Sequence, residues 1–92
     1  MPDRTFTLDV VTPERLVLRD EVVSLVVPGV EGYLGVLAGH APLMTELKAG
    51  ELTIRRADGT HAGMTIGGGF MDVAHDRAVI LADSALTGEE GG

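Results

Sequence analysis

The 92-residue sequence predicts an all-β domain, a sandwich or flattened barrel of eight to ten short strands. Apolar and polar residues alternate over many short stretches, which is the period of a half-buried strand. Turn-forming residues recur at close spacing, with thirteen glycines and four prolines in the chain. No stretch has a convincing helical pattern, so the composition favours strands joined by tight turns.

The N-terminal quarter predicts two strands and a turn. Residues 5–11 place Phe6, Leu8 and Val10 on one face and polar residues on the other. Pro13 fixes the backbone of the turn that follows, and alternation resumes over residues 16–19. Residues 22–27 form a mostly β-branched run that is typical of a central strand, and Pro28 with Gly29 ends it.

The middle of the chain predicts short strands at residues 33–37 and 43–47. A helix over residues 37–47 is the competing interpretation, but Gly39 and Pro42 fall inside it and Pro alone costs a helix about 3 kcal/mol. Residues 51–56 alternate again and lead to Asp58-Gly59, a dipeptide that favours a hairpin turn to residues 61–66. After three glycines, residues 70–74 and 77–83 form a last predicted hairpin through His75-Asp76.

Charge and composition exclude several kinds of partner. Seven basic against fourteen acidic residues give a net charge of -7, which opposes binding to nucleic acid. The chain has no cysteine, no apolar stretch near the roughly 20 residues of a membrane span, and no signal-peptide pattern at its start. We therefore expect a soluble domain that does not itself insert into a membrane.

Motifs for catalysis or cofactors are lacking in the sequence. The histidines are far apart and have no metal-ligand spacing: His40, His61 and His75. Neither Ser24 nor Ser84 lies in a nucleophile elbow, and no glycine-rich loop has the sequence of a phosphate site. The acidic pairs Asp20-Glu21 and Glu89-Glu90 are interpreted as solvated charge. We expect no enzyme activity, no cofactor and no metal site.

One segment has more shaped turns and apolar residues than packing alone demands. Residues 28–45 contain four glycines and two prolines beside Tyr33, Leu37, Leu43 and Met44. Rigid loops that carry apolar side chains often form recognition surfaces. The alternative is that these residues are only the corners of a small sandwich.

Several motifs resemble the epsilon subunit of F-type ATP synthases. They are Leu-Asp-Val-Val-Thr-Pro-Glu at 8–14, Pro-Gly at 28–29, Gly-Tyr-Leu-Gly-Val at 32–36, Gly-His-Ala-Pro-Leu at 39–43, Gly-Gly-Phe at 68–70 and Val-Ile-Leu-Ala-Asp-Ser-Ala at 79–85. The resemblance covers residues 5–85. It implies a ten-stranded β-sandwich. We expect the domain to cover residues 1–86 and residues 87–92 to form a flexible tail, because residues 88–92 have no apolar face.

The resemblance also implies a function. Such a subunit is a non-catalytic part of the central stalk, the rotor that links the membrane c-ring to the catalytic head. It binds the gamma subunit and contacts the c-ring, so that ion flow is coupled to ATP synthesis. The implied location is the cytoplasmic face of the bacterial inner membrane, as a peripheral part of the ATP synthase.

Residues of the family's contact surfaces match positions in this sequence. The positions that lie against gamma correspond to Thr12, His40, Ala41, Pro42, Leu43, Met44 and Thr45. The loop that faces the c-ring corresponds to Glu31, Gly32 and Tyr33. Many relatives have an acidic residue where this chain has Tyr33, so Tyr33 itself cannot form that ion pair with the ring. Glu31 remains available as a carboxylate, and an aromatic residue can also anchor an interface. Leu43 and Met44 are the expected apolar anchors, and Gly35 and Gly69 are expected to be needed for folding.

The sequence ends where typical relatives continue into a pair of helices that can inhibit ATP hydrolysis. We expect a short form of the subunit, either natural or truncated, that supports coupling without inhibition by such helices. Two other functions stay open on the residues alone. One is a stand-alone β-sandwich that binds a small ligand, which the three aromatic residues make less favourable. The other is a small metalloenzyme that uses the three histidines.

Overall fold

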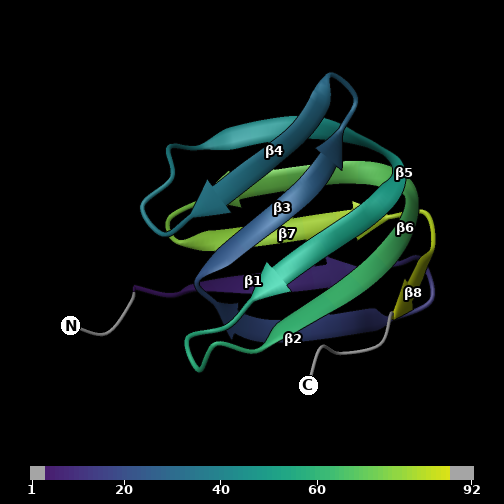
Figure 1. The fold of residues 1–92 in the computed structure, drawn as a ribbon. Helices are drawn as coiled ribbons and strands as arrows, with labels where there is room; N and C mark the ends of the chain where they lie inside the picture. The colour runs from purple at the N-terminus through teal and green to yellow at the C-terminus, as the bar shows by residue number, and fades with distance from the viewer. Residues whose placement is uncertain (1–3, 88–92) are drawn as a thin grey trace.

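The computed structural model describes residues 4–87, and every regular element in that range is a strand (Figure 1). The eight strands are β1 (Phe6–Val11), β2 (Leu16–Val22), β3 (Ser24–Gly29), β4 (Gly32–Leu37), β5 (Leu43–Arg55), β6 (His61–Ala74), β7 (Arg77–Ala82) and β8 (Ala85–Thr87). They follow the order β2-β1-β7-β6-β5-β3-β4, and β8 pairs with β6. The all-β prediction is confirmed.

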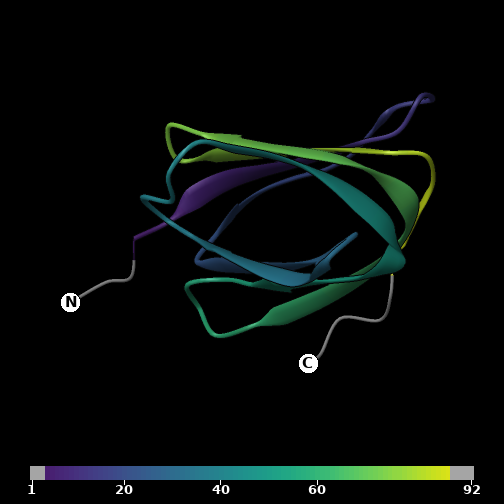
Figure 2. The same ribbon diagram turned by 90° about the horizontal axis from the view of Figure 1, so that it is seen from above.

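Two layers enclose the interior, as Figure 2 shows from above. One layer contains β2, β1, β7, the second half of β6 and the first half of β5. The other contains the remaining halves of β5 and β6 together with β3, β4 and β8. Neighbouring strands are antiparallel except β1 and β7, which are parallel.

The strand count is eight where about ten were expected, because two predicted breaks are bends. Residues 43–47 and 51–56 were expected as separate strands, but β5 runs through both. Likewise β6 runs through the glycines at 67–69. The ladder continues across both bends, since Leu47 pairs with Gly69 and Gly50 pairs with Ile66.

A glycine is required at the bend of β6. Gly69 has a φ of 149°, and a Cβ there would collide with the carbonyl oxygen of Leu81 on β7. The predicted need for Gly69 therefore has a steric cause. The same expectation for Gly35 is wrong, because nothing lies within 4 Å of the place where its Cβ would be.

The expected strand over residues 22–27 is interrupted at Val23, which separates β2 from β3. β2 is correspondingly longer than predicted and includes Asp20 and Glu21. These carboxylates have partners: Asp20 Oδ2 lies 2.5 Å from Arg56 Nε, and Glu21 Oε1 accepts a hydrogen bond of 2.7 Å from Thr7 Oγ1. They were expected as solvated charge on a turn. The other acidic pair, Glu89-Glu90, lies outside the described residues.

The short strand β8 and two hairpin turns complete the sheet. β8 includes Thr87, one residue beyond the predicted domain boundary, and the rest of the predicted tail lies outside the described residues. Asp58-Gly59 turns β5 into β6, with the Asp58 carboxylate accepting the Thr60 N–H at 2.9 Å. His75 and Asp76 both have positive φ, 53° and 56°, in the turn from β6 to β7.

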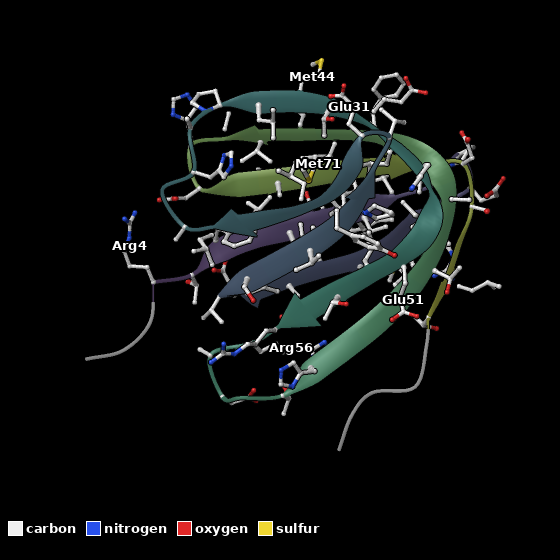
Figure 3. All side chains as sticks on the ribbon, turned by 45° about the horizontal axis from the view of Figure 1, so that its top comes forward. Arg4, Glu31, Met44, Glu51, Arg56 and Met71 are labelled. Atoms are coloured by element: carbon white, nitrogen blue, oxygen red, sulfur yellow. The ribbon has the colours of Figure 1, made fainter. Side chains whose placement is uncertain are left out.

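The core lies between the layers and consists of the inward-facing residues of β1 to β7. Alternation places Phe6, Leu8 and Val10 in it, as predicted. Met71 points into the interior and Met44 points away from it, as Figure 3 shows. The buried cluster comprises Phe6, Leu8, Val10, Val22, Leu25, Val27, Val36, Leu47, Leu52, Ile54, Met64, Ile66, Met71, Val73, Ala78, Ile80 and Ala82.

Candidate protein-binding surface

An apolar strip crosses the outer face of the first layer. Val11, Leu81 and Phe70 stand side by side on β1, β7 and β6, because the register pairs Val11 with Leu81 and Leu81 with Phe70. Phe70 is 53% exposed and Leu81 is 56% exposed. Their sequence neighbours Met71 and Ile80 face the core, as the period of a strand requires. Large apolar side chains are therefore exposed to solvent on the outer face of this layer.

Met44 extends this strip onto β5. The register pairs Glu46 with Phe70 and Met44 with Asp72, so Met44 shares the outer face and is 72% exposed. Met44 is therefore exposed, as an apolar anchor of a protein interface has to be in the free domain. We call Val11, Met44, Phe70 and Leu81 the apolar strip.

A hollow of about 590 Å³ adjoins the strip, between the β1–β2 connection and the bends of β5 and β6. Thr12 forms part of its wall. Thr12 is buried, and its backbone and hydroxyl both hydrogen-bond with Arg15, which closes the tight connection around Pro13. The wall is made of Val11, Thr12, Pro13, Glu46, Leu47, Lys48, Ala49, Gly67, Gly68, Gly69, Phe70, Leu81, Ala82 and Asp83.

A cluster of one carboxylate and two guanidinium groups lies on the same face. Asp9 is only 3% exposed, although its side chain points outward, because two arginines cover it. Arg19 Nε lies 2.8 Å from Oδ1, and Arg77 Nη2 lies 2.5 Å from Oδ2. The hydrogen bond from Arg19, aided by Arg77, lowers the pKa of Asp9 although burial alone would raise it. The cluster carries a net positive charge on an acidic chain.

The loop from β4 to β5 carries three further predicted residues. The His40 N–H donates to the Leu37 carbonyl at 3.1 Å, which closes a turn in which Gly39 has a φ of 80°. The His40 Nδ1 is 2.7 Å from the Ala41 carbonyl oxygen, so the ring is held against its own loop. Ala41 and Pro42 are exposed.

The start of β5 divides the remaining predicted residues between two faces. Leu43 packs against the core and Thr45 is half-buried, whereas Met44 points outward. Leu43 is thus not a second exposed anchor beside Met44, because adjacent residues of a strand face opposite sides.

Glu31 lies in the turn between β3 and β4, and Gly32 and Tyr33 are the first two residues of β4. All three are exposed, and Tyr33 is exposed to 66%. This turn lines a second hollow of about 320 Å³ together with Leu43 and Thr45. Figure 3 shows Glu31 and Met44 at the same end of the molecule. The structure therefore brings the two predicted contact segments next to each other.

The three histidines lie in separate places: His40 in the β4–β5 loop, His61 at the start of β6 and His75 in the β6–β7 turn. Among residues 4–87, no group of three potential ligands lies close enough to hold a metal ion. The same part of the chain contains no helix that could cross a membrane.

These features define an all-β sandwich domain with an exposed apolar face, the kind of module that packs against other proteins. The family model for the β-sandwich domain of the ATP synthase Delta/Epsilon chain matches residues 5–88. The chain belongs to this family, as the sequence motifs predicted.

Relatives and solved structures agree with this family. The chain is 45% identical to the ATP synthase epsilon chain of Moorella thermoacetica, over 94% of its own length and 64% of the relative. It is 44% identical to the epsilon chain of Syntrophomonas wolfei, over 98% and 66% of the two chains. The chain thus spans about two thirds of the length of these curated relatives.

A chain in the structure of the Euglena gracilis mitochondrial ATP synthase, described as OSCP/F1/c-ring, matches with a TM-score of 0.87 and 25% identity, over 95% of this chain and 56% of that one. A chain of the Tetrahymena thermophila mitochondrial ATP synthase, described as central stalk/c-ring, matches with a TM-score of 0.75 and 16% identity, over 94% and 69%. The second likeness supports the fold alone.

Phe70, Leu81 and Val11 were missed as surface residues from the sequence. The sequence did contain the information, because the alternation of inward and outward positions along each strand places all three residues on the outer face. Their meeting in one strip depends on the pairing of strands that are distant in sequence, which the sequence pattern does not reveal.

Proposed function

We propose that this chain is a non-catalytic central-stalk subunit of an F-type ATP synthase. In this role it binds the gamma subunit, contacts the c-ring and helps to couple ion flow to ATP synthesis, while the catalytic head carries out the chemistry. The observation that carries the proposal is the apolar strip, an exposed face without a partner among the described residues, on a domain of the epsilon family.

The strip and the hollow beside Thr12 form the proposed gamma-binding surface. A protein interface needs an apolar centre with a polar rim. Here Phe70 and Leu81 form the centre, and Lys48, Asp83 and the Asp9 cluster lie around it. The two-layer sandwich holds these side chains on paired strands, so little order has to be gained on binding.

The β4–β5 loop extends the proposed surface beyond the strip. Its backbone is fixed by the His40–Leu37 hydrogen bond, and β5, which follows it, places Met44 on the strip. Residues 40–45 therefore join the loop to the apolar centre, which supports their assignment to the gamma-facing surface.

The β3–β4 turn and the start of β4 form the proposed c-ring contact. Glu31 supplies a carboxylate and Tyr33 an exposed aromatic ring with a hydroxyl group, so both polar and apolar contacts with a ring loop are available. Its position beside Leu43 and Thr45 fits a domain that meets gamma and the ring at one end.

The proposed location follows from the assembly. The relatives described above are bacterial epsilon chains, and in a bacterium an F-type enzyme of this kind would hold the chain at the cytoplasmic face of the inner membrane. The chain would be peripheral there, attached through gamma and the c-ring.

The test is to mix the purified chain with the gamma subunit of the same source and to measure binding by calorimetry and size exclusion. We expect a tight one-to-one complex. Addition of the chain to an epsilon-depleted enzyme in vesicles should also restore ATP synthesis driven by an ion gradient. Absence of binding between two demonstrably folded partners would overturn the proposal.

A further inference from the structure

Asp76, in the turn between β6 and β7, joins three segments that are far apart in sequence. Its Oδ1 accepts the Gly39 N–H at 2.6 Å, across 37 positions, and its Oδ2 lies 3.1 Å from Arg4 Nη2, across 72 positions. Its backbone carbonyl accepts the Thr7 N–H at 3.0 Å. Arg4 precedes β1 at the edge of the sandwich, as labelled in Figure 3.

The Gly39 N–H needs an acceptor from outside its own turn. The turn is closed by the His40 N–H, which donates to the Leu37 carbonyl. Gly39 is the third residue of this turn, and its φ of 80° is the value typical of that position in a type II turn. The N–H of that residue is not used by the turn, so the Asp76 carboxylate supplies its partner. A hydrogen bond to a charged oxygen is stronger than one to a neutral oxygen.

The backbone of Asp76 does not explain why an aspartate is there. Both residues of the His75-Asp76 turn have positive φ, a conformation that glycine adopts more easily than any other residue. A glycine would therefore form the turn at least as easily. The contacts of the Asp76 side chain, and not the backbone conformation, explain why an aspartate stands at this position.

We infer that Asp76 is a positioning residue that fixes the β4–β5 loop in the shape that meets the partner protein. The inference rests on the proposed function, in which residues 40–45 contact gamma. By holding Gly39, the carboxylate fixes the turn immediately before His40, Ala41 and Pro42. The exposed ion pair with Arg4 contributes little by comparison, because solvent screens both side chains.

The matched variants are Asp76→Gly and Asp76→Asn. Glycine keeps the positive φ and removes the acceptor, whereas asparagine tolerates the same φ and keeps an Oδ1 acceptor. Arg4→Ala removes the ion pair and leaves the carboxylate in place. All three changes are on exposed residues, so the chains should fold. Asp76→Gly should melt lower than the original chain, because it loses the hydrogen bond to the Gly39 N–H.

The first readout is exchange of the Gly39 amide proton by NMR in the isolated chain, which needs no partner. We expect faster exchange in Asp76→Gly and protection in Asp76→Asn and Arg4→Ala. The second readout is affinity for gamma. We expect Asp76→Gly to bind roughly tenfold more weakly, because the released loop has to be ordered when gamma binds, and the other two variants to bind within about twofold of the original chain.

The outcomes separate the two proposals. If Asp76→Gly exposes the Gly39 amide but binds gamma as tightly as the original chain, or if Asp76→Asn weakens binding as much as Asp76→Gly, the positioning role is overturned. If the original chain does not bind gamma at all, the proposed function is overturned, whatever the amide exchange shows about the loop.

Discussion

Replacing Phe70 with alanine should weaken the complex with gamma while leaving the isolated domain folded. Phe70 stands at the centre of the apolar strip, between Leu81 on β7 and Glu46 on β5. Its ring lies on the outer face and is absent from the buried cluster of the core. Truncation therefore removes surface that a partner would cover and opens no internal cavity.

The size of the effect follows from the area that remains for a partner to bury. A phenylalanine side chain presents about 200 Å² in all. Phe70 is 53% exposed in the free domain, so a partner that covers the ring completely would remove about 100 Å² from water. At about 25 cal/mol per Å² this area corresponds to about 2.5 kcal/mol. Alanine keeps part of the contact, so we expect a loss of about 2 kcal/mol, roughly 30-fold in Kd.

The assay is isothermal titration of gamma with each variant, beside chemical denaturation of each variant alone. Leu86→Ala is the matched control. Leu86 is 74% exposed, but it pairs with Thr65 on the other layer, away from the strip. We expect Leu86→Ala to bind gamma with unchanged affinity. Both variants should stay folded, and Phe70→Ala should be less stable by up to about 2 kcal/mol, because the covered half of the ring loses its packing.

Two results would refute this reasoning. Unchanged affinity of Phe70→Ala for gamma would show that the strip is not the binding face. Equal weakening by Phe70→Ala and Leu86→Ala would show that the loss does not come from contact at the strip.

Three further predictions follow from the same structure. Met44→Glu should leave the free energy of unfolding within about 0.5 kcal/mol of the original, because the side chain is exposed. In titration it should weaken gamma binding by about 2 kcal/mol or more, since a charge would be buried at the interface. An unfolded variant would contradict the exposed position of Met44. Asp9→Asn should lower the free energy of unfolding at pH 7 by at least about 1 kcal/mol. The free energy of unfolding of this variant should also decrease less in acid than that of the original chain. The pKa of Asp9 is lowered below 3.8 in the folded chain, so its stabilisation is complete above that value and is lost as the pH falls through the lower folded pKa. Denaturation curves of both chains at pH 7 and pH 3 check this. An identical pH dependence in both chains would count against it. Gly69→Ala should destabilise the domain by about 3 kcal/mol or more in urea, whereas Gly35→Ala should change stability by less than about 0.5 kcal/mol; similar midpoints for the two variants would disprove the steric argument.

Much of the fold was predictable because alternation is a local property. The inward positions of Phe6, Leu8 and Val10 follow from period two alone. The bends of β5 and β6 were not predictable in the same way, because glycine both ends strands and lets them bend. Only the continuous pairing of Leu47 with Gly69 and of Gly50 with Ile66 distinguishes a bend from a break.

The candidate surface was predicted in part. The resemblance to the epsilon family supplied Thr12, the β4–β5 loop and the β3–β4 turn, and the alternation of β5 turns Met44 outward and Leu43 inward. Phe70 and Leu81 were missed, because an exposed apolar residue is ordinary until its neighbours across the sheet are known. The Asp76 contact with Gly39 links two turns whose proximity depends on the whole strand order.

The long hairpin of β5 and β6 has a mechanical consequence. Because both strands pass from one layer to the other, the pairing of β5 with β6 keeps one register through both layers, with a gap of one pair between Leu47–Gly69 and Ala49–Gly67. One layer cannot slide over the other without breaking the backbone hydrogen bonds between β5 and β6, so the sandwich resists shear as one body. A sideways load applied near Met44 would reach the opposite layer through main-chain bonds, without relying on the contacts between side chains in the core.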